Sequence, residues 1–289
     1  MGQVLSFRTR NSNVSPSSSI DKLTDDQVYE LIAGRQRGQL VGYDKDLDVM
    51  GAAQVYRITP DAHHEAFTMQ YVAERTSIPI PRVRKVFPDR KDHSKHWIVM
   101  DFISGQTLMH CWPMLSICRK LCIMCTLWWY IHQAKNVPLP NPDIPGPFDG
   151  TGLPLLCRGP QFPDNGASPL KNYQELVIWF DYQLYSHQVR LYRAWGLLWK
   201  SPKFPQLVGS GNPLVFCHND LNMRNIMLDD NNRVWLLDWE YSGAYPPWFD
   251  YAVLKGWANA VNPDRRLPRL FRIFIPIIAG NHSLIYHHY

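Results

Sequence analysis

Residues 215–240 read VFCHNDLNMRNIMLDDNNRVWLLDWE, an apolar stretch interrupted by polar residues at set distances. His218 and Asp220 are two residues apart, Asn225 follows five residues after Asp220, and Asp238 ends the apolar run VWLL. Burying carboxylate and amide groups costs free energy unless a partner replaces the lost hydration. A metal ion that carries phosphate would be such a partner.

The polar tetrapeptide DDNN stands between the apolar segments IML and RVWLLD, which is typical of a β-hairpin with a tight turn. The outer ends of such an antiparallel pair lie side by side, so Asn225 and Asp238 are expected to converge. Calcium binding by DDNN itself is disfavoured, because an EF-hand loop needs a glycine that is missing here, and Arg233 stands at a ligand position. Two oxygen ligands suit Mg²⁺ bound to a nucleotide, because this ion fills its other positions with phosphate and water.

Asp220 lies on the loop that enters the predicted hairpin, near the expected metal ion but without an obvious need to bind it. A carboxylate in that place could accept a hydrogen bond from an attacking hydroxyl group. Phosphoryl transfer has a loose transition state, so positioning and charge neutralisation dominate its catalysis. The stretch therefore predicts phosphoryl-transfer chemistry.

The composition is that of a globular protein, with 289 residues of which 45% are hydrophobic and 19% charged. The net charge of +5 is mild and no run of Lys or Arg occurs, so a nucleic-acid partner is not expected. No apolar stretch reaches the roughly 18 residues of a membrane span. No secretory signal is visible, and a reducing, cytoplasmic setting is expected.

The first residues, MGQVLS, fit the pattern for N-myristoylation at Gly2. Arg8 and Arg10 would add weak attraction to anionic lipid, so membrane association through the N-terminus is one interpretation. The alternative is an untethered disordered tail, which the Ser- and Asn-rich NSNVSPSSS favours.

Cysteines and histidines do not form a recognisable metal-binding pattern. Three of the six cysteines lie in CRKLCIMC, inside an apolar run with no further ligands nearby, which predicts buried thiols on a core helix. Three further groups also lack partners at ligand spacing and are interpreted as surface histidines: His63 with His64, His93 with His96, and the terminal HHY.

The chain divides into a small lobe and a larger one. The spacing of apolar residues predicts helices over 21–37, 61–76, 115–132 and 171–200, and strands over 40–59, 83–87 and 97–102. Residues 133–170 are rich in Pro and Gly and predict a long loop. We expect an α+β protein with a tail over 1–20, a nucleotide-binding lobe over 21–103, and a mainly helical catalytic and substrate-binding lobe over 104–289.

These elements together resemble the protein-kinase-like fold of the aminoglycoside/choline phosphotransferase family, in particular its fungal members. The H-x-D-x-x-x-x-N signature stands as HNDLNMRN, the metal motif as LLDWE, and the downstream element as GAYPPWFDYA. HHEAFTMQYVAERTSIPIPRV and HWIVMDFISGQTL resemble the first lobe and the hinge of that family. The likeness covers residues 40–255, with several elements in the right order.

The resemblance implies roles for the residues of the opening stretch. Asp220 would be the catalytic base or would orient the acceptor hydroxyl, and Asn225 and Asp238 would hold Mg²⁺. The segment HNDLNMRN, residues 218–225, would form the catalytic loop. His218 would organise this loop, and Asp250 would support it through a hydrogen bond.

The resemblance also implies an ATP site in the small lobe. Backbone groups of four hinge residues would meet the adenine edge: Met100, Asp101, Phe102 and Ile103. Glu65 would pair with the cation that binds the phosphates, for which the strand VYRIT offers Arg57.

Three positions depart from the family pattern. Arg57 stands where a Lys is usual, and the two side chains are not equivalent, so Arg57 could contact phosphate or could fail to fit. Asn219 stands where the family has Gly, a position where an unusual backbone angle is expected and Asn is the next most tolerant residue. Gly42 and Gly51 are isolated, so no G-x-G-x-x-G phosphate loop exists.

The leading hypothesis is an ATP- and Mg²⁺-dependent phosphotransferase that acts on a hydroxyl group of a small molecule. The net basic charge disfavours polycationic antibiotics, while choline, an amino alcohol, a sugar or a secondary metabolite all remain open. The alternative is a nucleotide-binding scaffold or pseudokinase of the same fold, which Arg57 favours. A protein-substrate kinase is disfavoured, because no Ala-Pro-Glu follows Asp238.

Overall fold

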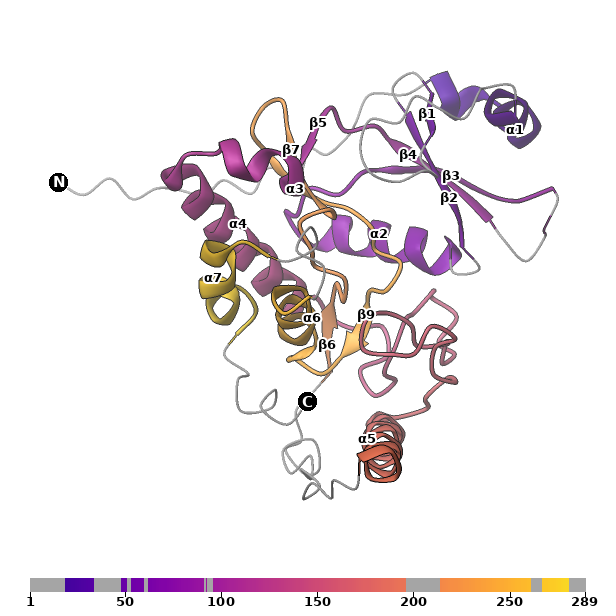
Figure 1. Cartoon of the computed structure of the whole chain (residues 1–289). Helices are drawn as coiled ribbons and strands as arrows, with labels where there is room; N and C mark the ends of the chain where they lie inside the picture. Colours follow the sequence, from indigo (N-terminus) through magenta and orange to yellow (C-terminus); the bar gives the residue numbers. More distant parts are fainter. Residues whose placement is uncertain are drawn as a thin grey trace.

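The computed structural model describes residues 19–33, 48–50, 53–59, 62–90, 92, 96–195, 214–260 and 267–280 (Figure 1). The acylation site at Gly2, the glycines Gly42 and Gly51, and the side chain of Arg57 lie outside this part of the chain. The predictions made for them therefore stay predictions.

The small lobe is an antiparallel sheet with helices on it. Its strands are β1 (Asp48–Met50), β2 (Ala53–Thr59), β3 (Val83–Pro88) and β4 (His96–Asp101), in the spatial order β1-β2-β4-β3. The 3₁₀ helix η1 (Ser19–Lys22) and helix α1 (Asp25–Ala33) pack at one end, where Ile20 and Val28 meet Phe87 and Val99. Helix α2 (Ala62–Arg75) contacts β3 and β4.

Two prolines end α2 and turn the chain back into the sheet. Pro79 and Pro81 follow shortly after Arg75, and a proline cannot supply the N–H that a continuing helix needs. The hydroxyl of Thr76 donates to the carbonyl of Val72 at 2.8 Å, which satisfies one carbonyl of the last helical turn.

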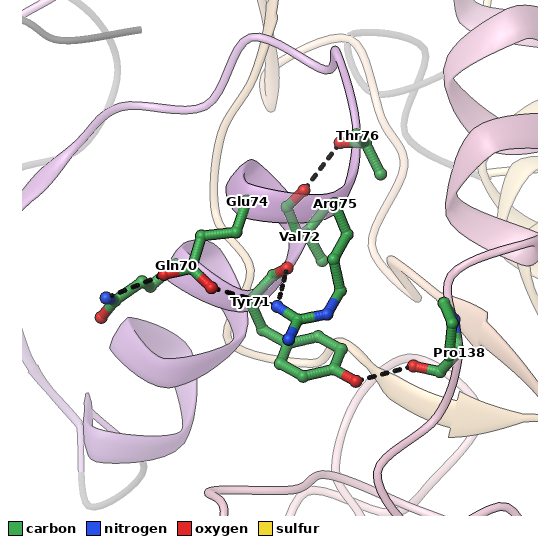
Figure 2. A network of polar contacts seen from close by, with 7 residues as sticks. All are labelled: Gln70, Tyr71, Val72, Glu74, Arg75, Thr76 and Pro138. Atoms are coloured by element: carbon green, nitrogen blue, oxygen red, sulfur yellow. Dashed lines mark hydrogen bonds and ion pairs between the residues drawn. The ribbon is translucent and has the colours of Figure 1, made fainter. Parts of the chain in front are cut away.

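Helix α2 is fastened to the larger lobe by hydrogen bonds. Figure 2 shows the Tyr71 hydroxyl donating to the carbonyl of Pro138 at 2.9 Å, with the Arg75 guanidinium 3.7 Å from the centre of the Tyr71 ring. The hydroxyl and the backbone N–H of Ser77 both donate to Gln133 Oε1, each at 2.9 Å. In Figure 1, α2 lies between the small sheet and the larger lobe.

A short connection leads from β4 into β5 (Gly105–Thr107), which pairs with β7 (Ile226–Asp229). Gly105 is needed at this crossing, because a Cβ atom there would lie 2.2 Å from the carbonyl oxygen of Leu228. The β5-β7-β8 sheet, with β8 (Val234–Leu236), thereby joins the start of the larger lobe to the hairpin that carries the polar residues.

The larger lobe is mainly helical, as predicted. Its helices are α3 (Leu108–Cys111), the 3₁₀ helix η2 (Trp112–Met114), α4 (Ile117–Lys135), α5 (Tyr173–Trp195), α6 (Phe249–Ala258) and α7 (Arg269–Ala279). Strands β6 (Val215–Cys217) and β9 (Gly243–Tyr245) pair with each other, and α4 packs against β6 and α7. The predicted two-lobed α+β architecture is therefore confirmed.

The prediction of buried thiols on α4 is wrong. Cys118, Cys122 and Cys125 are all exposed, because α4 turns the other side, with Ile123 and Leu127, into the core. An apolar run does not reveal which side of its helix faces outward when both sides are uncharged.

His64 was also wrongly placed on the surface. Its side chain is 3% exposed, and its Nδ1 lies 2.8 Å from the carbonyl oxygen of Phe148 in the larger lobe. His63 beside it is exposed. None of the described helices is long and apolar enough to cross a membrane.

Candidate active site

The hairpin β7–β8 brings the two predicted metal ligands to one place. Ile226 pairs with Leu236, and the N–H of Leu237 donates to the carbonyl of Asn225 at 2.9 Å, so the strands stay paired up to the residue before Asp238. The turn is closed by Asp229, whose Oδ1 accepts from the backbone N–H of Asn231 at 2.9 Å.

Asp220 lies beside Asn225, buried and bonded through both carboxylate oxygens. Asn225 Nδ2 donates to Oδ2 at 2.8 Å, and Asn222 Nδ2 donates to Oδ1 at 3.1 Å. Burial raises the pKa of Asp220 to about 7, and the negative charge of Asp238 contributes in the same direction. The negative charge of Asp238 is therefore felt at the Asp220 carboxylate.

Glu65 of the small lobe contacts the segment of the larger lobe that carries Asp238. Asp238 has φ +62°, a left-handed backbone angle that is uncommon for a residue with a side chain. Glu65, which is 1% exposed on α2, accepts a hydrogen bond at Oε1 from the N–H of Trp239 at 3.3 Å. The small lobe thus touches the LLDWE segment directly. The predicted pairing of Glu65 with Arg57 stays a prediction.

His218 supports the loop as a neutral imidazole. Its Nδ1 accepts from the N–H of Asp220 at 3.3 Å, so Nε2 carries the proton and donates to the carbonyl of Leu237 at 3.1 Å. Burial lowers the pKa of His218 to about 4. His218 therefore links Asp220 to the strand end that precedes Asp238.

We expect His218 to make folding stability sensitive to acid. Its pKa is about 4 in the folded protein and ordinarily about 6.5. The unfolded chain therefore binds more protons between these values, and stability present above pH 6.5 is lost as the pH falls to 4, by about 3 kcal/mol. Urea unfolding of wild type and His218→Gln across this range measures the difference. Contributions of the carboxylates cancel in this comparison.

An exposed histidine provides the control for this measurement. His132→Gln on α4 should keep the wild-type slope of unfolding free energy against pH. An equal slope in wild type and His218→Gln would contradict a neutral, buried His218.

Asn219 adopts the backbone angle that its position in the motif predicts. Its φ is +61°, in the left-handed region that Gly favours and Asn tolerates. Its N–H donates at 2.9 Å to Oδ1 of Asp250, a fully buried residue at the start of α6. Burial raises the pKa of Asp250. Asp250 thus fixes the backbone of the loop at Asn219, the residue that precedes Asp220.

The four predicted hinge residues differ in whether their backbone N–H and C=O groups are already paired within the sheet. Met100 and Asp101 belong to β4, where Met100 pairs with Gln54 on one side and Val83 on the other. Ile103 lies after the strand, and its N–H and C=O make no backbone hydrogen bond to another described residue. Phe102 lies between them and is half-buried.

Sequence reasoning missed the second hydrogen-bond partner of Asp220. Asn222 is 3% exposed and bonded to Asp220, although a single Asn in a loop gave no signal. The Pro- and Gly-rich segment also touches the loop from His218 to Asn225, where the carbonyl of Arg158 accepts from Asn219 Nδ2 at 3.4 Å. Gly159 permits this approach, since a Cβ there would lie 2.8 Å from Asn219 Nδ2 and 3.1 Å from Cβ of Tyr241.

Comparison with known protein families gives one family over most of the chain. The family model described as "Phosphotransferase enzyme family" matches residues 52–274. This range runs from β2 of the small lobe into α7 and includes the hinge and the loop from His218 to Asp238.

Among curated proteins, the chain is similar to Protein LicA of Haemophilus influenzae. The two are 50% identical over 38 residues, which cover 13% of this chain and 14% of LicA. The match therefore spans about one seventh of the length of that relative.

Solved structures give the same fold at low sequence identity. A thermostable mutant of aminoglycoside phosphotransferase APH(4)-Ia, in a ternary complex with ADP and hygromycin B, has a TM-score of 0.55 at 16% identity, over 90% of this chain and 85% of the other. The gentamicin–APH(2'')-IIa complex has a TM-score of 0.50 at 15% identity, over 90% and 83%. These matches establish the architecture.

Proposed function

Because this chain belongs to the phosphotransferase enzyme family, we propose that it transfers the γ-phosphoryl group of ATP, held with Mg²⁺, to a hydroxyl group of a small molecule. The observation that carries this proposal is the convergence of Asp220, Asn225 and Asp238 at one end of the β7–β8 hairpin. A base, an amide and a second carboxylate at one point are what metal-assisted phosphoryl transfer requires.

The residues present fit a magnesium site. The proximity of Asp238 to the buried Asp220 leaves excess negative charge, which a divalent cation would neutralise. Asn225 would offer Oδ1, because its Nδ2 already donates to Asp220, and Asp238 would offer its carboxylate. When bound, Mg²⁺ would neutralise charge on the phosphates during transfer.

The reaction assigns a separate task to Asp220. The acceptor hydroxyl donates a hydrogen bond to the Asp220 carboxylate, which orients its oxygen towards the γ-phosphorus. A bond forms between that oxygen and the phosphorus while the bond from the phosphorus to the β-phosphate oxygen breaks. ADP leaves, and the hydroxyl proton passes to Asp220.

Nucleotide binding would use the hinge and the small lobe. The backbone N–H and C=O of Ile103 could meet the adenine edge, and Arg57 on β2 could reach the phosphates, with Glu65 close to the metal motif. The ADP in the structural neighbour supports a nucleotide site of this kind.

The acceptor would lie beside the catalytic loop, where the segment around Arg158 and Gly159 packs. The chain carries a net charge of +5, which does not favour a polycationic acceptor such as an aminoglycoside. Neutral or singly charged alcohols, including sugars and amino alcohols, fit this charge better.

One observation favours a second candidate, a nucleotide-binding scaffold without turnover. Arg57 replaces the usual Lys, and a guanidinium cannot reproduce the compact charge of an ammonium group. The assembled Asp220, Asn225 and Asp238 favour catalysis, because a scaffold has no need of a buried base beside a metal site.

A screen of hydroxylated metabolites tests the proposal. We expect at least one acceptor to increase ADP release from Mg-ATP, and Mg²⁺ to be required both for this release and for a rise in melting temperature with ATP. If ATP with Mg²⁺ raises the melting temperature but no acceptor increases ADP release, the scaffold is supported. If ATP changes nothing, both candidates are excluded.

A further inference from the structure

The Asp220 carboxylate is fixed by a second amide besides that of Asn225. We propose that Asn222 is a positioning residue, which fixes the carboxylate of Asp220 for the acceptor hydroxyl and couples that carboxylate to the backbone of the proposed metal ligand Asn225. The expected effect on kcat rests on the proposed function, whereas the hydrogen bonds of Asn222 do not depend on it.

The amide nitrogen of Asn222 is directed at Asp220. Nδ2 lies 3.1 Å from Asp220 Oδ1 and 3.2 Å from the carbonyl oxygen of the same residue. Asn222 is 3% exposed and Asp220 is 7% exposed, so water does not compete freely for these bonds.

The amide oxygen of Asn222 faces the opposite way. Oδ1 accepts from the backbone N–H of Arg224 at 2.8 Å and from the N–H of Asn225 at 3.3 Å. These two donors determine the orientation of the amide, because a flipped side chain would place its NH₂ group against them. Asn222 is therefore held at one end by the loop backbone and holds Asp220 with the other.

This arrangement leaves Asp220 able to act. An ionised carboxylate has about four lone-pair sites, two on each oxygen. Asn222 occupies one on Oδ1 and Asn225 occupies one on Oδ2, so each oxygen retains a site for the acceptor hydroxyl. Without Asn222, the bond from Asn225 alone would not prevent the carboxylate plane from turning, and misplacement by about 1 Å can cost about 10²-fold in rate.

Two substitutions separate the two ends of the side chain. Asn222→Ala removes both, whereas Asn222→Asp keeps an oxygen for the N–H groups of Arg224 and Asn225 but cannot donate to Asp220. We expect both variants to lower kcat by about 10- to 100-fold, with the KM for ATP within about threefold of wild type. The matched control is Asn172→Ala, which removes a similar bond to a backbone N–H, that of Glu175, on the exposed start of α5. It should keep wild-type kcat.

The outcomes that overturn the inference are distinct. Wild-type kcat in Asn222→Ala would show that Asp220 needs no such support. Wild-type kcat in Asn222→Asp, with a loss in Asn222→Ala, would assign the effect to the loop backbone alone. A KM for ATP that rises in step with the fall in kcat would indicate general damage to the site.

The absence of turnover in the wild-type protein would contradict the proposed function. A structural measurement tests the role of Asn222 independently of that result. In crystal structures of both variants, we expect the Asp220 side chain to leave its wild-type orientation. An unmoved carboxylate in Asn222→Ala would overturn the inference, whatever the enzyme assays show.

Discussion

Replacing Asp220 by Asn should lower kcat by about 10²- to 10⁴-fold, the usual contribution of a positioned general base. Asn has the same shape but cannot take up the proton of the acceptor hydroxyl. Binding of Mg-ATP should remain within a fewfold of wild type, because Asp220 is not proposed as a metal ligand. Acceptor-dependent ADP release measures turnover, and isothermal titration calorimetry measures nucleotide binding.

A conservative change at an exposed aspartate serves as the control. Asp26→Asn removes a surface ion pair with Arg90, in which Asp26 is 84% exposed, and should leave both measurements unchanged. Retained turnover in Asp220→Asn would remove the proposed base, and the reaction would then need another group to receive the proton.

The activity should also depend on pH through Asp220. Its pKa is about 7 in the protein without a cation, mainly because the carboxylate is buried. Only the ionised form accepts the proton, so kcat/KM should fall as the pH drops through this pKa. Because a bound cation favours the carboxylate, the midpoint should lie at or below pH 7 when Mg²⁺ is present. A constant kcat/KM down to pH 4 would contradict this assignment.

Removing the carboxylate of Asp238 should abolish the Mg²⁺ dependence of ATP binding and lower kcat by about 10²- to 10³-fold, because metal charge stabilisation is worth several kcal/mol. Two variants separate the metal from the backbone. Asp238→Ala and Asp238→Gly both remove the proposed ligand, but Gly accepts the φ of +62° without strain while Ala does not.

Both variants should therefore lose the Mg²⁺-dependent rise in melting temperature with ATP. Asp238→Ala should be less stable than Asp238→Gly by about 1 kcal/mol, because only Ala keeps a Cβ atom at the left-handed backbone angle. A normal Mg²⁺ response in Asp238→Gly would show that the metal is held elsewhere.

The sequence contained enough information to predict the hairpin and its polar ends. Alternation and the DDNN turn determine which residues pair, and pairing brings Asn225 and Asp238 together without further assumptions. The left-handed angle at Asn219 was likewise expected, because a motif position that usually carries Gly indicates a backbone need.

The sequence pattern could not predict contacts that depend on the path of a loop or on a distant segment. The partnership of Asn222 with Asp220 depends on the path of the loop, and the burial of His64 depends on Phe148, 84 residues later. The exposed face of α4 was missed for another reason. Its Cys and Trp residues are apolar, so composition alone does not distinguish the outer side from the side that carries Ile123.

The hydrogen bonds between α2 and the larger lobe limit how far this helix can move. In a kinase-like architecture, a helix that swings away from the metal motif can serve as an off state. Here Tyr71 and Glu65 on that helix bond to Pro138 and Trp239 of the larger lobe. His64 on the same helix contacts Phe148, and Ser77, just after the helix, bonds to Gln133. Moving it away would break these bonds together, so we expect α2 to stay against the larger lobe whether or not a nucleotide is bound.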